Sequence, residues 1–335
     1  MKVKKNHFYF GIIVLILIVA GVLYYFNPFQ KKSEKLQSQY TDKGSLKEEY
    51  KTQWSVDKNG YLNYYPEDRG EVVFSRSNYW ENDSIAVSKI IYKSRYADIY
   101  GFLVLPKIVA NTLPGAVLLP GAGVSKESEL PLAEQISQLG VAVLTIDSRG
   151  VGETGGNFPN LDEDYSSFLQ SKEPVQHLAV YDALRGFDLL RSAPFVDKNR
   201  VIIAGESFGG RVAIIATAID KNVKGVFVIS TAGFHFPGGN DTSKDIFIKS
   251  IDSDHYIDDI TPRKLVMMHN YNDKNILVSS AATSFSIAQE PKSFLVVNDT
   301  TCSHGYCDSM YEGLVAGLDW IVGLNKVSDG NETNK

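Results

Sequence analysis

The strongest constraint on the fold is a serine flanked by glycines, placed between an apolar segment and an alanine-rich one. Residues 201–210 read Val-Ile-Ile-Ala-Gly-Glu-Ser-Phe-Gly-Gly, and the helix-compatible segment 211–220 follows at once. This pattern predicts a buried strand, a sharp turn at Ser207 and then a helix. Such a turn strains the serine backbone, and Gly205 and Gly209 leave room for it because neither carries a Cβ. We therefore expect Ser207 to be a nucleophile presented at the end of a strand.

The composition limits the classes of function that this chain can have. A chain of 335 residues with 44% hydrophobic content can bury one large core. The net charge of −5 gives no polycationic surface, so we expect no nucleic-acid partner. The two cysteines, Cys302 and Cys307, could close a small disulfide loop in an oxidising compartment or remain free thiols.

The N-terminus carries a membrane signal. After a short flank, 1–7, residues 8–26 form an uncharged, mostly aliphatic stretch with aromatic residues at both edges and lysines beyond them. As a helix it would span about 28 Å, close to the hydrocarbon thickness of a bilayer. We expect a retained single-pass anchor in the cell membrane, with the catalytic part outside the cytoplasm. A cleaved signal peptide is the alternative, although no A-x-A-like site follows the stretch.

The rest of the chain divides by composition into a tether with an N-terminal packing segment (27–83), an α/β domain (84–325) and a polar tail (326–335). Within the α/β domain, apolar strand patterns alternate with helical ones, which indicates a mostly parallel sheet. The expected strands are 85–92, 98–105, 115–119, 141–146, 201–206, 225–230, 264–268 and 293–297. The expected helices are 129–139, 175–190, 211–220, 279–289 and 310–324.

A serine nucleophile needs a base and an acid that orients the base. In strand-loop-helix hydrolases these follow in the order serine, acid, histidine. His304 is the one histidine beyond the last expected strand, so we predict it to be the general base. Asp273 is the single carboxylate in the loop after strand 264–268, and we predict it to be the acid. Asp241 and Asp299 are weaker alternatives.

The oxyanion of an acyl-transfer intermediate needs backbone donors. The N–H of Phe208 follows the nucleophile at a helix N-terminus, which favours negative charge. The second donor should come from the glycine-containing loop after strand 115–119, where we predict the N–H of Ala122, with Gly121 or Gly123 as alternatives.

Two other patterns admit competing interpretations. Residues 147–156 are rich in glycine but lack the Gly-Lys-Ser/Thr end of a phosphate loop, so we interpret them as a tight loop braced by Asp147 and Arg149. Cys302, His304 and Cys307 resemble three zinc ligands, but no fourth ligand is near in sequence. We therefore expect neither a metal nor a cofactor.

From these motifs the chain resembles the α/β-hydrolase superfamily over about residues 84–324. It looks most like the branch of dienelactone-hydrolase-like esterases, acetyl-xylan-esterase-like enzymes and the catalytic domains of prolyl-oligopeptidase-type peptidases, which include dipeptidyl and acylaminoacyl peptidases. Residues 119–123, 147–152 and 205–210, with Asp273 and His304 in order, carry the resemblance. It implies an eight-stranded, mostly parallel sheet with helices on both faces, and the same roles for Ser207, Asp273 and His304. The chain departs from this family in having Pro120-Gly121 where His-Gly is usual.

The expected function is hydrolysis of carboxylic esters, with a small-molecule ester or short acyl substrate. Peptide or amide hydrolysis is an alternative, but residues 27–83 are too few for the propeller that such peptidases carry. Acyl or thioester transfer and a catalytically silent binding protein are further alternatives. The inserts 157–173 and 232–260 could shape the substrate pocket.

Overall fold

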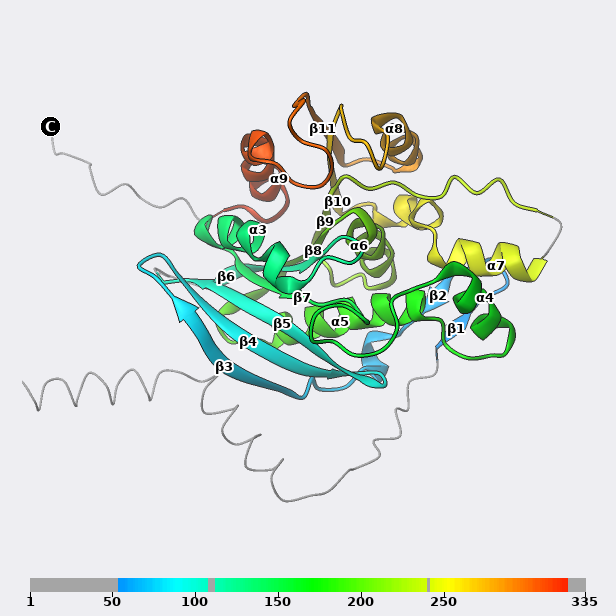
Figure 1. Ribbon diagram of the computed structural model, residues 1–335, viewed down its shortest axis with the longest axis horizontal. Coiled ribbons are helices and arrows are strands. Elements are labelled where there is room, and N and C mark those ends of the chain that lie inside the picture. The colour runs from blue at the N-terminus through cyan, green and yellow to red at the C-terminus, as the bar shows by residue number, and fades with distance from the viewer. Residues whose placement is uncertain (1–53, 108–111, 240–241, 325–335) are drawn as a thin grey trace, which may run out of the picture.

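A mixed β-sheet forms the centre of the computed structural model, which describes residues 54–107, 112–239 and 242–324. Its strands are β3 Phe74–Glu81, β4 Ile85–Ser94, β5 Ala97–Pro106, β6 Leu113–Leu119, β7 Ala142–Ile146, β8 Val196–Glu206, β9 Gly225–Ile229, β10 Lys264–Asn270 and β11 Lys292–Val297. The nine strands lie in the order β11-β10-β9-β8-β6-β7-β5-β4-β3 (Figure 1). The strands from β11 to β7 in this order are parallel, and β5, β4 and β3 continue the sheet antiparallel.

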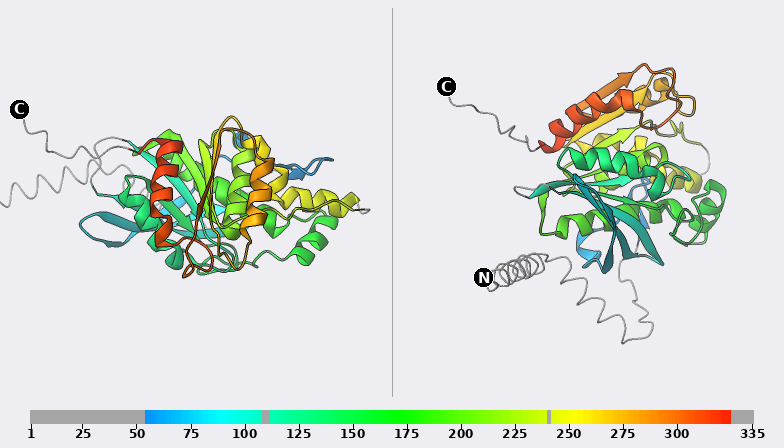
Figure 2. Two further views of the ribbon diagram at one scale, coloured as in Figure 1. Left: turned by 90° about the horizontal axis from the view of Figure 1, so that it is seen from above. Right: turned by 60° about the vertical axis from the view of Figure 1, so that its left-hand side comes forward.

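Helices cover both faces of the sheet, because parallel strands are apolar on both sides. The helices are α3 Lys126–Gln138, α4 Leu161–Leu169, α5 Val175–Ser192, α6 Ser207–Ile219, α7 Thr242–Ile251, α8 Val278–Ile287 and α9 Tyr311–Val322. Apolar side chains of α5, α6 and α8 belong to one core cluster, and those of α3 and α9 to the other. Figure 2 shows α8 and α9 on opposite sides of the strands. The alternation of strands and helices predicted from the sequence is confirmed.

The expected number of eight strands is wrong, because β3 adds a ninth at the edge of the sheet. Its sequence, Phe-Ser-Arg-Ser-Asn-Tyr-Trp-Glu, buries Phe74 alone. An edge strand that faces solvent needs no alternation of apolar residues, so the pattern on which the prediction depended is missing here.

The segment before β3 packs on the α/β body, where Leu62 and Tyr64 join its core. It contains a two-stranded antiparallel sheet, β1 Ser55–Val56 with β2 Leu62–Asn63. The buried guanidinium of Arg69 donates from Nε and Nη2 to both carboxylate oxygens of Asp188 on α5, at 2.8 and 2.9 Å. It also pairs with Asp220 at the end of α6.

The predicted membrane anchor, 8–26, lies outside the described residues. Within 54–107, 112–239 and 242–324, every helix is too short or too polar to cross a bilayer.

The two inserts predicted to shape the pocket form helices α4 and α7, which pack against each other. The ring centroid of Phe247 in α7 lies 5.5 Å from those of Tyr165 and Phe168 in α4, and the rings are tilted relative to one another. Below them His177 of α5 is fully buried and its Nε2 lies 2.7 Å from the hydroxyl of Ser250. We call α4 and α7 together the cap.

Candidate active site

Ser207 occupies the sharp corner between β8 and α6. Its φ of 49° lies in the left-handed region, which a residue with a side chain rarely adopts. A Cβ at Gly209 would meet the carbonyl oxygen of Leu119, and one at Gly205 would come within 2.5 Å of the carbonyl carbon of Gly209. Both glycines are therefore required for the close approach of α6 to β8 and β6. This geometry presents the serine as the sequence predicts, although its nucleophilic role stays a prediction.

The loop after β6 lies beside the corner. A Cβ built on Gly121 would be 3.6 Å from the Cβ of Ser207, so the loop borders the serine. Gly121 accepts a hydrogen bond from the N–H of Val124 at 3.1 Å, and Gly123 has a φ of 73°. The N–H groups of Phe208 and Ala122 thus belong to the two segments that flank Ser207. Their predicted role as oxyanion donors is untested.

Asp273 and His304 are in direct contact. His304 Nδ1 lies 3.0 Å from Oδ1 and 2.9 Å from Oδ2 of Asp273. Burial alone would raise the pKa of Asp273, but the N–H of Ile276, the ring of His304 and the N–H of Asn275 together lower it. Asp273 is therefore ionised at neutral pH, and its carboxylate accepts a hydrogen bond from the Nδ1–H of His304. With Nδ1 protonated, Nε2 is the basic atom of the ring.

The loop that carries His304 is bonded to the residue before the nucleophile. The N–H of Tyr306 donates to Glu206 Oε1 at 2.6 Å. The N–H of Gly305 donates at 3.2 Å to the hydroxyl of Ser230, the residue directly after β9. Cys302 and Cys307 form a disulfide that closes the same loop, which resolves the alternative left open by the sequence.

The structure therefore brings the His304 loop to the Ser207 corner through Glu206. No hydrogen bond joins the Ser207 hydroxyl to the His304 ring in the described part of the chain. In unliganded hydrolases this bond is often long and tightens with substrate. Of the alternative acids, the Asp299 carboxylate accepts from Thr301 rather than from His304. Asp241 lies outside the described residues.

A second carboxyl beside Glu206 escaped the sequence analysis. Glu129 of α3 is buried, and its Oε1 has no hydrogen-bond partner. Burial raises the pKa of Glu129 well above its usual range, and the nearby charge of Glu206 raises it further. Burial also raises the pKa of Glu206, against the opposing effects of the Tyr306 N–H and of His304. Of the two carboxyls, Glu129 is thus the one whose protonated form burial favours more strongly, and Glu206 is the one that interacts with His304.

The glycine-rich loop 147–156 is braced as expected, but Lys126 is its main partner. Asp147 accepts from the backbone N–H and the Nζ of Lys126, at 2.7 and 2.8 Å, and from the N–H of Glu153 at 2.9 Å. Arg149 donates from Nε and Nη2 to the carboxylate of Asp182 on α5, at 2.7 and 2.8 Å. The loop thus connects β7 to α3 and α5, and it offers no phosphate cradle.

Aromatic side chains surround the corner on the cap side. Phe208, which follows the nucleophile, lies 5.5 Å between centroids from Phe158 in the first insert. The guanidinium of Arg211 lies over the rings of Phe208 and Phe234, 5.3 and 4.3 Å from their centroids. A small cavity of about 20 Å³ lies beside Phe208 and is lined in part by Leu119 and Pro120. Among the described residues, no cluster of three or more His, Cys, Asp or Glu side chains could hold a metal ion.

Comparison with known proteins assigns a family. The family model of the acetyl xylan esterases (AXE1) matches residues 34–235, which is more than half of the chain. Among solved structures, the acetyl xylan esterase of Paenibacillus sp. R4 superimposes with a TM-score of 0.62 at 18% identity, covering 76% of this chain and 90% of that one. The acetyl xylan esterase 1 of Thermoanaerobacterium sp. gives 0.57 at 16% identity, covering 74% and 87%. Identities this low show the fold alone.

Curated relatives match shorter stretches. A polyketide transferase of Penicillium sp. is 29% identical over 118 residues, which are 35% of this chain and 36% of the relative. An uncharacterised protein of Escherichia coli O157:H7, YfhR, is 26% identical over 149 residues, 43% of this chain and 52% of the relative. The chain thus spans about a third to a half of the curated relatives that it matches. The family match confirms the suspected hydrolase branch, and the structural neighbours show the same fold.

Proposed function

The chain belongs to the acetyl xylan esterase (AXE1) family, and from that premise we propose that it is a serine hydrolase of carboxylic esters with Ser207, His304 and Asp273 as its catalytic triad. One observation carries the proposal. A serine with a φ of 49° between a strand and a helix adjoins a loop whose histidine is held by a buried aspartate. That combination of nucleophile, oriented base and acid is the geometric requirement of acyl-enzyme chemistry.

In the proposed mechanism, His304 Nε2 takes the proton of the Ser207 hydroxyl as its oxygen attacks the acyl carbon. The oxyanion that forms is stabilised by the N–H groups of Phe208 and Ala122. His304 then returns the proton to the leaving alkoxide. In the second half of the reaction, His304 takes a proton from the water that attacks the acyl-enzyme and returns it to the Ser207 oxygen as the carboxylic acid leaves. Asp273 stays ionised throughout and stabilises the imidazolium.

The triad is tested with p-nitrophenyl acetate and a fluorophosphonate probe. We expect Ser207→Ala to abolish labelling, and Ser207→Ala, His304→Ala and Asp273→Asn each to lower kcat by about 10³-fold or more. Near-wild-type turnover by His304→Ala would contradict the base assignment. Aminoacyl p-nitroanilides, assayed in parallel, separate ester hydrolysis from the peptidase alternative. A protein that neither labels nor turns over either substrate would be a silent binding protein.

The space at the corner favours a short acyl group. The cavity beside Phe208, about 20 Å³, has room for only one or two water-sized groups. The ring of Phe208, which lines it, lies 5.5 Å between centroids from that of Phe158. We expect acetyl esters to be cleaved with higher kcat/KM than octanoyl esters. Phe158→Ala should shift this preference towards the longer chain without lowering acetyl turnover more than a few fold. Equal preferences in both proteins would contradict the proposed pocket.

The proposal includes a membrane anchor at residues 8–26, with the catalytic domain outside the cytoplasm. Its support is the sequence: an uncharged apolar stretch between lysine-rich flanks. The full chain should stay with the membrane fraction after alkaline carbonate extraction, and a C-terminal tag should be open to protease from outside the cell. Release into the carbonate supernatant would contradict the anchor.

Acyl transfer is a second candidate, favoured by the partial identity to a polyketide transferase. The same acyl-enzyme would then pass its acyl group to an alcohol rather than to water. Formation of a new ester when p-nitrophenyl acetate is turned over with an added alcohol would support it. Unchanged yields of acetate at every alcohol concentration would exclude it.

A further inference from the structure

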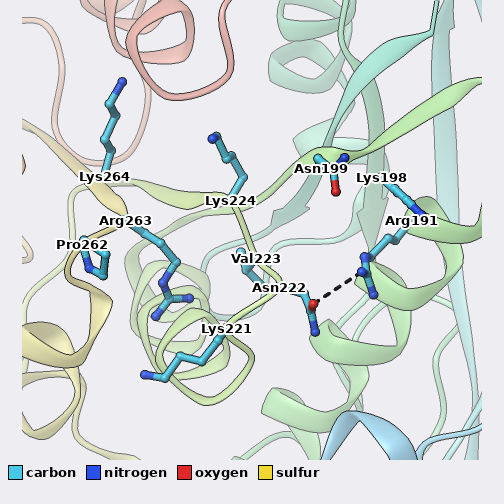
Figure 3. A pocket seen from close by; sticks show the side chains of 10 residues that line it. All are labelled: Arg191, Lys198, Asn199, Lys221, Asn222, Val223, Lys224, Pro262, Arg263 and Lys264. Carbon is cyan, nitrogen blue, oxygen red and sulfur yellow. Dashed lines mark hydrogen bonds between the residues drawn. The ribbon is translucent and has the colours of Figure 1, made fainter.

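A basic pocket lies at the edge of the sheet opposite to Ser207. Lys198 is in the first part of β8, Lys224 directly precedes β9 and Lys264 begins β10, whereas Ser207 and Asp273 follow the other ends of β8 and β10. The pocket has a volume of about 370 Å³, within the range of small-molecule sites. Figure 3 shows its lining, which includes six cationic side chains: Arg191, Lys198, Lys221, Lys224, Arg263 and Lys264.

No carboxylate lines this pocket, and in the described ranges none of its six cations forms an ion pair. By contrast, buried and surface cations elsewhere, such as Lys126 and Lys89, pair with acids. The chain carries a net charge of −5, so a concentration of unpaired positive charge on one edge is not a consequence of composition. Like charges gathered without counter-charges destabilise the fold slightly, and a bound anion would remove that cost.

Part of the cluster has a structural explanation. Arg263 donates from Nε to the carbonyl of Ile260 and from Nη2 to that of Asp259, both at 3.0 Å. Lys221, just past the end of α6, donates to the carbonyl of Asp259 at 3.1 Å. Cations at helix C-termini stabilise the helix dipole, and those two side chains serve that purpose. Burial lowers the pKa of both groups, and the nearby carboxylate of Asp259 opposes that shift only in part.

Lys264 also has a protein partner, because its Nζ donates to the carbonyl of Trp320 at 2.6 Å and lies 5.0 Å from the centroid of that ring. Lys198, Lys224 and Arg191 have no such task. Lys198 and Lys224 are exposed, and within the described residues the ammonium group of neither forms a hydrogen bond or an ion pair. Arg191 makes one long hydrogen bond, from Nη2 to Asn222 Oδ1 at 3.4 Å, and its buried Nε has no partner (Figure 3). An unpartnered buried donor is costly, so the guanidinium would gain from an acceptor in the pocket. Asn199 and Asn222 add amide donors to the same lining.

We propose that this basic pocket binds a phosphate-bearing ligand, separate from the esterase site. A phosphate group accepts hydrogen bonds through several oxygens and carries up to two charges, so it can engage several ammonium groups and a guanidinium at once. A single carboxylate would leave most of these cations unmatched. The phosphate could come from a soluble phosphate compound or from the headgroup of an anionic lipid.

Calorimetric titration of the full chain in a nonionic detergent tests the proposal. Inorganic pyrophosphate represents a soluble phosphate, and glycerophosphoglycerol represents a lipid headgroup. The double variant Lys198→Gln/Lys224→Gln removes two cations that have no recorded protein partner, so it should fold and retain ester hydrolysis. Lys58→Gln/Lys172→Gln removes two exposed lysines that do not line the pocket, which makes it a control with the same change in charge.

We expect wild type to bind at least one probe, with an affinity that falls as salt is added. Lys198→Gln/Lys224→Gln should weaken binding about tenfold or more, and the control pair should change it less than about threefold. Tighter binding of pyrophosphate assigns the site to a soluble phosphate, and tighter binding of glycerophosphoglycerol assigns it to a lipid headgroup. Binding of neither probe to wild type, or equal weakening in both double variants, overturns the proposal.

Discussion

The carboxylate of Glu206 lies between Ser207, the proposed nucleophile, and the loop that carries His304. It accepts the N–H of Tyr306 at 2.6 Å, so it fixes the loop from the strand side while Asp273 fixes the ring itself. Glu206 also faces Gly305, whose added Cβ would lie 3.4 Å from Glu206 Oε2. These contacts make Glu206 a positioning residue for His304.

Two substitutions separate the hydrogen bond of Glu206 from its charge. Glu206→Ala leaves the Tyr306 N–H without its acceptor, and we expect it to lower the free energy of unfolding by about 1–3 kcal/mol. Glu206→Gln keeps an acceptor oxygen and should retain most of that stability, as measured by urea unfolding. Both should lower kcat more than they change KM, with the larger loss in Glu206→Ala. Glu312→Ala, on an exposed face of α9, is the control.

At this scale, sequence reasoning locates residues that belong to a local motif and misses those defined by distant contacts. The sequence points to Ser207 because Gly205 and Gly209 lie two positions before and after it. It points to Asp273 and His304 because each follows a predicted strand. Glu206 lies inside the motif, but its partner, Tyr306, is 100 positions away and contributes a backbone N–H, which leaves no mark in the sequence. Glu129 has the same character, because a glutamate in a helix is usually exposed.

At the scale of elements, a buried histidine is one of the groups that attach the cap to the body. The Nε2 of His177 in α5 bonds the hydroxyl of Ser250 in α7, and its Nδ1 is buried without a partner. The rings of Trp54, Phe168 and Phe247 lie within 6.4 Å of the imidazole, measured between centroids. Burial lowers the pKa of His177 to about 3. The imidazole is therefore neutral in the folded protein, and protonating it would place a charge in an apolar site.

This histidine should make stability depend on pH. Below pH 6.5 the unfolded chain binds a proton at His177, whereas the folded protein does not until about pH 3. The free energy of unfolding should thus fall as pH decreases from 6.5 towards 3, by about 1.4 kcal/mol for each pH unit from this group. His177→Phe cannot titrate and should lack that part of the slope. Equal slopes for the two proteins, measured by urea unfolding at each pH, would contradict this assignment.

The helices and strands that the sequence predicts are those in which apolar residues recur at the spacing of a helix or a strand. Helices α4 and α7 are not predicted because only Asp164 of α4 and three residues of α7 are buried, too few for an apolar period. Strand β3 is not predicted because it borders the sheet on one side only. Each of these elements is defined by what it packs against, and that information is absent from a local window.

Across the whole molecule, the segment 54–73 is joined to the α/β body by charged contacts that the sequence does not indicate. Arg185 of α5 donates from Nη1 to the carbonyls of Arg69 and Gly70, at 2.6 and 2.9 Å, and from Nη2 to that of Glu71 at 3.0 Å. Arg69 in turn reaches Asp188 and Asp220. The segment therefore connects the helical layer with the first strand of the sheet, and its one arginine, Arg69, is buried.

Arg69→Met should destabilise the whole domain, because it leaves the buried carboxylate of Asp220 without its cation. Losing one partner of a buried pair costs about 3–5 kcal/mol, against less than about 1 kcal/mol for an exposed pair. The control is Lys107→Met, since Lys107 pairs with Glu81 at the surface at 3.3 Å. The measurement is the urea unfolding of the full chain, followed by tryptophan fluorescence. If the two variants lose equal stability, segment 54–73 is not held by Arg69, and its apolar contacts through Leu62 and Tyr64 must carry the attachment.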